Sequence, residues 1–111
     1  METEPITPVL FRADRSGEFR GSVTAVFPCE PADYSGNGMT CYAHIGQHGA
    51  CDYGWYTTTR AATPAEYADL KAELEAQPYG YRFKVYKRMQ PWMRRELRAE
   101  ARRIRNVTAA A

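Results

Sequence analysis

The sequence predicts a single α+β domain, in which an antiparallel sheet of about four to five strands carries two helices packed on one face. Alternating apolar and polar residues, the period-2 pattern of strands, fill the first half of the 111-residue chain. A capping box and two stretches with helical periodicity fill most of the second half. Hydrophobic residues make up 44% of the chain, which suits one core at this length. The expected order of elements is β-β-β-(β)-α-β-α.

The first two expected strands pair most simply as a hairpin. A short apolar run, VLFR, occupies residues 9–12, and the turn composition DRSG follows at residues 14–17. Residues 19–27 then alternate, with Phe19 and Phe27 on one side of the chain and mostly polar residues on the other. This alternation is typical of a half-buried strand.

A third strand is expected over residues 39–45, after a loop at residues 28–38 that is rich in Pro, Gly and Asn. Residues 55–59 (WYTTT) are aromatic and β-branched, the chemistry of a strand. We expect them to form a fourth strand that returns beside the third.

The clearest local signal is a capping box at residues 63–66 (TPAE), with proline at the first helical position. It predicts a helix that runs to about Gln77, with Tyr67, Leu70 and Leu74 as its apolar face. Pro78 follows and ends it.

The chain is expected to finish with one strand and one helix. Aromatic and aliphatic residues alternate with polar ones over residues 81–86, which predicts a strand. Pro91 opens the last helix. The apolar face of this helix consists of Met93, Leu97, Ala101 and Ile104. The single domain covers residues 1–111, with residues 1–7 and 107–111 frayed at its ends.

The segment from Cys41 to Cys51 has the spacing Cys-x2-His-x3-His-x2-Cys and offers two alternatives to simple packing. Thiolate and imidazole are ligands that zinc prefers, so Cys41, His44, His48 and Cys51 are candidate zinc ligands. Zinc modules take their ligands from two separated pairs, however, and a strand would point Cys41 and His44 to opposite faces. The same cysteines and histidines, with Asp52 as an orienting carboxylate, are also the residue types of a thiol nucleophile.

Charge is distributed very unevenly along the chain. Residues 82–105 carry ten Lys or Arg and two Glu, a net charge of +8, whereas the rest of the chain carries −6. On the last helix, arginines at helical spacing form a basic stripe with Trp92 at its start: Arg94, Arg98, Arg102 and Arg105, broadened by Arg95 and Arg103. Such a stripe suits nucleic-acid phosphates, with stacking on an aromatic neighbour, or an acidic protein surface.

Aromatic residues near the Cys/His segment form a second candidate surface, because amphipathic aromatics are frequent in binding hot spots. The residues of this surface are Tyr42, His44, Gln47, His48 and Trp55.

Several classes of protein are not expected. No apolar run approaches the ~18 residues of a membrane span, and the first five residues (METEP) are acidic, unlike a secretory signal. Three cysteines, an odd number, favour a reducing cytoplasm over a disulfide framework. Common catalytic motifs such as GxSxG, a phosphate loop or HExxH are missing from the sequence, so we expect no catalytic residues and no cofactor.

Two segments resemble a small family of proteins from bacteriophages, plasmids and bacterial genomes. They are CYAHIGQH at residues 41–48, preceded by VTAVFP at residues 23–28, and TPAEYADL at residues 63–70, followed by Glu73 and Leu74. The resemblance covers about residues 8–90 and carries no established activity. It implies a mobile-element gene, and small phage proteins often bind and block host machinery, as anti-CRISPR proteins do.

Together these observations predict a non-enzymatic cytoplasmic protein that binds a host or phage macromolecular machine and modulates or inhibits it. One alternative is a nucleic-acid-binding protein that uses the basic last helix. Another is a zinc-binding domain built on the Cys/His segment.

Overall fold

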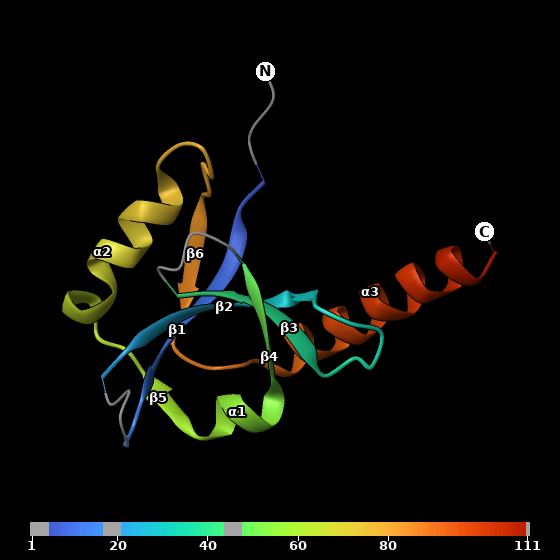
Figure 1. The fold of residues 1–111 in the computed structure, drawn as a ribbon, viewed down its shortest axis with the longest axis horizontal. Helices are drawn as coiled ribbons and strands as arrows, with labels where there is room; N and C mark the ends of the chain where they lie inside the picture. The colour runs from blue at the N-terminus through green and yellow to red at the C-terminus, as the bar shows by residue number, and fades with distance from the viewer. Residues whose placement is uncertain (1–4, 17–20, 44–47, 111) are drawn as a thin grey trace.

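The α+β class and the antiparallel sheet are confirmed by the computed structural model, which describes residues 5–16, 21–43 and 48–110. The elements are β1 (Thr7–Asp14), β2 (Val23–Pro31), β3 (Gly38–Tyr42), β4 (Gly49–Asp52), α1 (Tyr53–Thr57), β5 (Thr59–Ala61), α2 (Pro64–Glu75), β6 (Phe83–Tyr86) and α3 (Pro91–Ala110). Figure 1 shows them in space. None of the helices in the described ranges is long and apolar enough to cross a membrane.

The six strands form one sheet in the order β4-β3-β2-β1-β5, and β6 also pairs with β1. Two strands therefore share one edge of β1. Residues 7–10 of β1 pair with β6 and residues 12–14 pair with β5. The β6 pairing is parallel: β5 runs antiparallel to β1, and the chain reverses its direction between β5 and β6, through α2. The end of β6 therefore lies close to β5, although the two are more than twenty positions apart in the sequence.

The two long helices lie on opposite faces of the sheet, which corrects the expectation that they share one face (Figure 1). Leu70 and Leu74 of α2 pack on the face that carries Val9, Phe11, Ala25 and Phe27. Met93 and Leu97 of α3 pack on the face that carries Leu10, Val26 and Met39. The central strands β1 and β2 are buried on both faces, so the sheet has an apolar layer on each side.

Residues 55–59 do not form the expected strand. The carboxylate of Asp52 accepts a hydrogen bond from the backbone N–H of Trp55 at 2.8 Å and caps the short helix α1. Only Thr59–Ala61 joins the sheet, as β5. A capping side chain thus outweighs the strand propensity of the aromatic and threonine residues that follow it.

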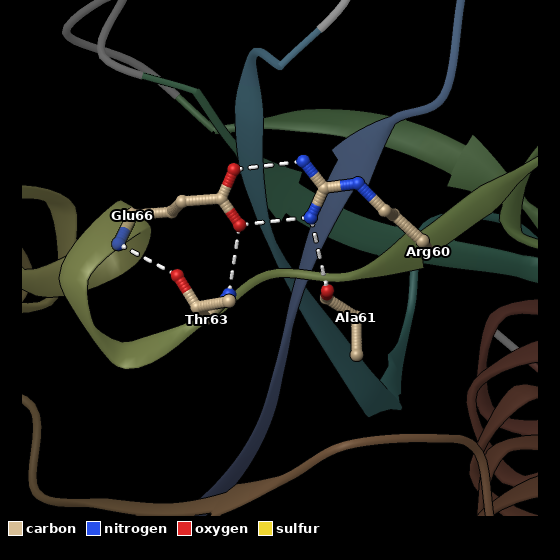
Figure 2. A network of polar contacts seen from close by, with 4 residues as sticks. All are labelled: Arg60, Ala61, Thr63 and Glu66. Atoms are coloured by element: carbon tan, nitrogen blue, oxygen red, sulfur yellow. Dashed lines mark hydrogen bonds and ion pairs between the residues drawn. The ribbon is translucent and has the colours of Figure 1, made fainter.

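The capping box of α2 forms as predicted. Thr63 Oγ1 accepts from the Glu66 N–H, and Glu66 Oε1 accepts from the Thr63 N–H. The Glu66 carboxylate also accepts hydrogen bonds from both terminal nitrogens of Arg60, and these bonds connect β5 to the start of α2 (Figure 2).

The predicted apolar face of α3 is buried at Met93, Leu97 and Ala101. The C-terminal half of α3 extends past the sheet (Figure 1).

Candidate functional site

One side of α3 and the loop between β2 and β3 enclose a shallow hollow, here called the α3 hollow, with a volume of about 180 Å³. Its lining residues are Tyr34, Ser35, Gly36, Arg98, Ala101, Arg102 and Arg105. The three arginines recur at intervals of four and three residues, so they project from one side of the helix. All three are exposed, and none has a carboxylate within ion-pair distance among the residues that the structure describes.

Hydrogen bonds within the loop hold this wall of the α3 hollow in place. Asp33 Oδ1 accepts from the Ser35 N–H at 2.9 Å and from its hydroxyl at 2.6 Å, and Ser35 Oγ accepts from the Asn37 N–H. The bonds from Ser35 lower the pKa of Asp33, because they stabilise its carboxylate. Gly36 has a φ of +84°, and a Cβ atom there would lie 3.1 Å from Arg98 Cγ. The loop backbone therefore lies directly against the Arg98 side chain.

Tyr34 spans from the loop to the last turns of α3. Its hydroxyl lies 3.3 Å from Thr108 Oγ1, and the residue is 50% exposed. An exposed aromatic ring beside three arginines is a combination that can stack on a nucleic-acid base while the arginines contact phosphates.

Arg94, the first arginine of the predicted stripe, makes contacts within the fold instead. Its guanidinium carbon lies 3.8 Å from the centre of the Tyr53 ring, and Nη2 donates to Asn37 Oδ1 at 3.2 Å. Its Nη1 is buried and has no hydrogen-bond partner among the described residues. The stripe is therefore divided into Arg94, which connects α3 to α1, and the three arginines of the α3 hollow.

The remaining predicted residues of α3 lie outside the hollow. Arg95 is exposed and lines neither this hollow nor the others described below. Trp92 is half-buried and packs edge-on against Tyr86, with ring centroids 5.8 Å apart. Arg103, which was expected to broaden the stripe, forms an ion pair with Glu100. Trp92 therefore belongs to the core beneath α3.

Tyr42 and His48 lie together, but on the face of the sheet that packs against α2. Tyr42 is 2% exposed and its hydroxyl donates to Glu73, which raises the pKa of Tyr42. The ring of His48 lies 5.2 Å from that of Tyr42, and its Nε2 is 3.0 Å from the Tyr81 hydroxyl. These two members of the second candidate surface are thus on the side of the sheet away from α3.

Trp55 and the two cysteines of the Cys/His segment line a separate open cavity of about 400 Å³. Its lining residues are Thr24, Cys41, Ala43, Ala50, Cys51, Asp52 and Trp55. The Cys51 thiol donates a hydrogen bond to the sulfur of Cys41, which lowers the pKa of Cys41 to about 7 and raises that of Cys51. The Asp52 carboxylate, the candidate orienting group for a thiol nucleophile, caps α1 by accepting a hydrogen bond from the Trp55 N–H.

The candidate zinc ligands do not converge in the part of the chain that the structure describes. Cys41 and Cys51 face the α3 side of the sheet, whereas His48 lies on the α2 side. His44 and Gln47 lie outside the described residues. Among the described residues there is no group of three or more His, Cys, Asp or Glu side chains that could hold a metal ion.

The structure also contains a basic hollow that sequence reasoning missed, centred on Arg12. This residue is only 7% exposed, and its guanidinium donates to Thr59 Oγ1 at 2.9 Å, to the Thr59 carbonyl at 2.8 Å and to the Lys87 carbonyl at 2.8 Å. The guanidinium also lies 4.4 Å from the centre of the Tyr56 ring. Burial lowers the pKa of Arg12, because it disfavours the charged form.

The hollow around this side chain, here called the Arg12 hollow, has a volume of about 400 Å³. Its lining residues are Arg12, Arg15, Tyr56, Arg60, Ala61, Lys87 and Arg88. One signal in the sequence pointed to it: an arginine inside the apolar run VLFRA, where a long charged side chain needs partners.

No family model, curated protein or solved structure matches this chain.

Proposed function

We propose that this protein is a non-enzymatic binding protein that contacts the phosphate backbone of a nucleic acid through the α3 hollow. The nucleic acid is either free or part of a nucleoprotein complex of the host or of a phage. Three exposed arginines with no described carboxylate partner, together in one hollow, carry this proposal.

The charge arrangement supports a polyanionic partner. Like charges at i, i+4 on a helix are destabilising by roughly 0.2–0.5 kcal/mol per pair. The helix nevertheless keeps Arg98, Arg102 and Arg105 on one side, with Glu100 already paired to Arg103. Phosphates spaced along a strand relieve this repulsion and release counterions as they bind.

The shape of the hollow favours a single strand over a duplex groove. The hollow is shallow and small, at about 180 Å³. Tyr34, half exposed beside the arginines, offers a ring on which an unpaired base can stack. A cationic surface with an adjacent aromatic side chain is the usual arrangement for single-stranded nucleic acid.

The test is fluorescence anisotropy with labelled single-stranded DNA and RNA across a series of salt concentrations. Three phosphate contacts predict a slope of log affinity against log salt of about −2 for a single strand. The double variant Arg98→Gln/Arg102→Gln should reduce the steepness of this slope by about 1.4.

Arg95→Gln is the matched control, because it removes one exposed charge from the same helix outside the α3 hollow. It should leave the slope nearly unchanged. Absence of binding at low salt, or an Arg95→Gln effect as large as that of Arg98→Gln, would contradict the proposal. Capture from a bacterial lysate with and without nuclease then separates free nucleic acid from a nucleoprotein partner.

A further inference from the structure

The Arg12 hollow collects basic side chains from three separate parts of the chain. Arg12 and Arg15 come from β1 and the residue after it, Arg60 from β5, and Lys87 and Arg88 from the segment after β6. They meet because β5 and β6 share one edge of β1. The volume of about 400 Å³ lies within the range of small-molecule sites.

Four of the five positive charges have no carboxylate partner among the described residues. Arg60 is neutralised by Glu66, which it contacts at 2.7 and 2.8 Å. No such partner is present in the described ranges for Arg12, Arg15, Lys87 or Arg88. Positive groups that share one concave surface repel one another and attract an anion.

The hollow is also rigid where an anion would bind. Three of the five N–H donors of Arg12 are used by Thr59 and Lys87, which leaves one N–H on each terminal nitrogen. Arg15 is held by a bond from its Nε to the Thr59 carbonyl at 3.0 Å, and neither of its terminal nitrogens has a hydrogen-bond partner among the described residues. Guanidinium groups fixed in this way lose little conformational entropy when they bind.

We propose that the Arg12 hollow binds a terminal phosphate group, with Arg12 at its floor and Arg15, Lys87 and Arg88 around the phosphate oxygens. A terminal phosphate carries about −1.5 to −2 charges at neutral pH and three strong acceptor oxygens. It therefore matches four cations that lack a carboxylate partner in the described part of the chain better than an internal phosphodiester, which carries one charge. Such a group occurs on a small phosphorylated molecule or at the 5′ end of a nucleic-acid strand.

This site is independent of the proposed function, because the two hollows share no lining residue. The test measures binding of a nucleoside 5′-monophosphate to the full chain by calorimetry, with the unphosphorylated nucleoside as the ligand control. Lys87→Gln/Arg88→Gln should weaken monophosphate binding at least about tenfold, since it removes two charge-assisted contacts. The variant keeps the Lys87 carbonyl that Arg12 requires.

Arg82→Gln/Lys84→Gln is the matched control, because it removes the same charge from the segment just before and within β6 but outside the hollow. Its affinity for the monophosphate should change less than about twofold, because salt screens the attraction between the phosphate and charges outside the hollow. Equal losses in the two double variants, or binding of the nucleoside as tight as that of the monophosphate, would overturn the assignment.

A second pair of probes distinguishes the two sources of the phosphate. A short oligonucleotide is compared with and without its 5′-phosphate in the Arg98→Gln/Arg102→Gln background, in which the α3 hollow is weakened. If the phosphorylated strand binds more tightly, the ligand of the Arg12 hollow is the 5′ end of a nucleic-acid strand. If only the mononucleotide binds, the ligand is a small phosphorylated molecule. If neither phosphorylated probe binds more tightly than its unphosphorylated form, the phosphate site is rejected, whatever the outcome for the α3 hollow.

Discussion

Arg94 of α3 lies against the ring of Tyr53 in α1, with 3.8 Å between the guanidinium carbon and the ring centre. Tyr53 stacks in turn on Tyr56, whose ring is covered by the guanidinium of Arg12 at 4.4 Å. The short helix α1 is thus connected by cation–π contacts to α3 on one side and to β1 on the other. These contacts give Arg94 a structural role that the three arginines of the α3 hollow do not share.

Arg94→Gln should therefore lower the free energy of unfolding by about 1–2 kcal/mol, through the loss of the contact with Tyr53 and the bond to Asn37. Arg98→Gln should stay within about 0.5 kcal/mol of the wild type, because Arg98 is exposed and unpaired among the described residues. Urea denaturation measures both values.

A double-mutant cycle with Tyr53→Leu checks the cause. In that background the effect of Arg94→Gln should shrink, because the ring contact is already lost. Equal destabilisation by Arg94→Gln with and without Tyr53 would show that the two side chains are not coupled.

Glu66 makes stability depend on pH through its contacts with Arg60 and Thr63 (Figure 2). The hydrogen bond from Arg60, followed by that from the Thr63 N–H, lowers the pKa of Glu66 from 4.5 to about 2. A carboxylate whose pKa is lowered in the folded state stabilises the fold above its unfolded pKa, and this contribution is lost as the pH falls. We expect the contribution of Glu66 to be constant above about pH 5 and to disappear between pH 4.5 and 2.

Thermal melting of the wild type and Glu66→Gln between about pH 2 and 7 measures this contribution. The difference in melting temperature should be largest near neutral pH and should close as the pH approaches 2. Asp69→Asn is the control, since Asp69 is an exposed carboxylate on the same helix. A Glu66→Gln difference that does not change with pH would contradict the link to this ionisation.

The sequence predicted well those elements whose signals are local. The TPAE box at residues 63–66 places the start of α2 correctly because all four residues of the signal act on one helical turn. The spacing of Met93, Leu97 and Ala101 likewise identified the buried side of α3. The arginines next to that side were found with it, because one periodicity determines both.

Features that depend on long-range pairing were not predictable from the sequence. The helices lie on opposite faces because β1 and β2 are apolar on both sides, which a short run such as VLFR does not reveal. The Arg12 hollow requires residue 87 to approach residue 12, and that approach follows from the parallel pairing of β6 with β1. Helix α1 was missed because the aromatic and threonine residues at 55–59 favoured a strand in the prediction, whereas the Asp52 cap starts a helix in the structure.

Cys41 should be the most reactive thiol of the three in the chain. The hydrogen bond from Cys51 lowers the pKa of Cys41 to about 7, so a large fraction of Cys41 is thiolate at neutral pH. Burial, with the nearby charge of Glu96, raises the pKa of Cys29 to about 11. Alkylation by iodoacetamide, followed by peptide mass spectrometry, should modify Cys41 first, with a rate that rises through a midpoint near pH 7.

Cys51→Ala removes the thiol that donates to Cys41 and should move this midpoint upward, toward the ordinary thiol value of 9.0. Cys29→Ala should leave it in place, because Cys29 is not a cause of the shift. Preferential alkylation of Cys29 in the wild type would show that the thiol pair does not control reactivity.

Arg12 holds the segment after β6 against β5, and its removal should loosen that segment in particular. In Arg12→Met the Thr59 carbonyl keeps its bond from Arg15, and Thr59 Oγ1 keeps its bond to the Tyr56 carbonyl, whereas the Lys87 carbonyl loses its donor. One unsatisfied carbonyl and the lost contact with Tyr56 predict a destabilisation of about 2 kcal/mol in urea denaturation.

Hydrogen exchange locates the effect of this substitution. The Met89 N–H donates to the Tyr56 hydroxyl at 2.7 Å, so its exchange reports on the docking of the segment after β6. Arg12→Met should accelerate exchange at Met89 more than at the core strand β2. Arg15→Met is the control, because it removes one exposed arginine and a single hydrogen bond. It should lower the free energy of unfolding by less than about 1 kcal/mol. Exchange at Met89 should stay slow, because the bond from Arg12 to the Lys87 carbonyl persists. Uniform acceleration across the sheet in Arg12→Met would mean that Arg12 supports the whole core rather than this segment.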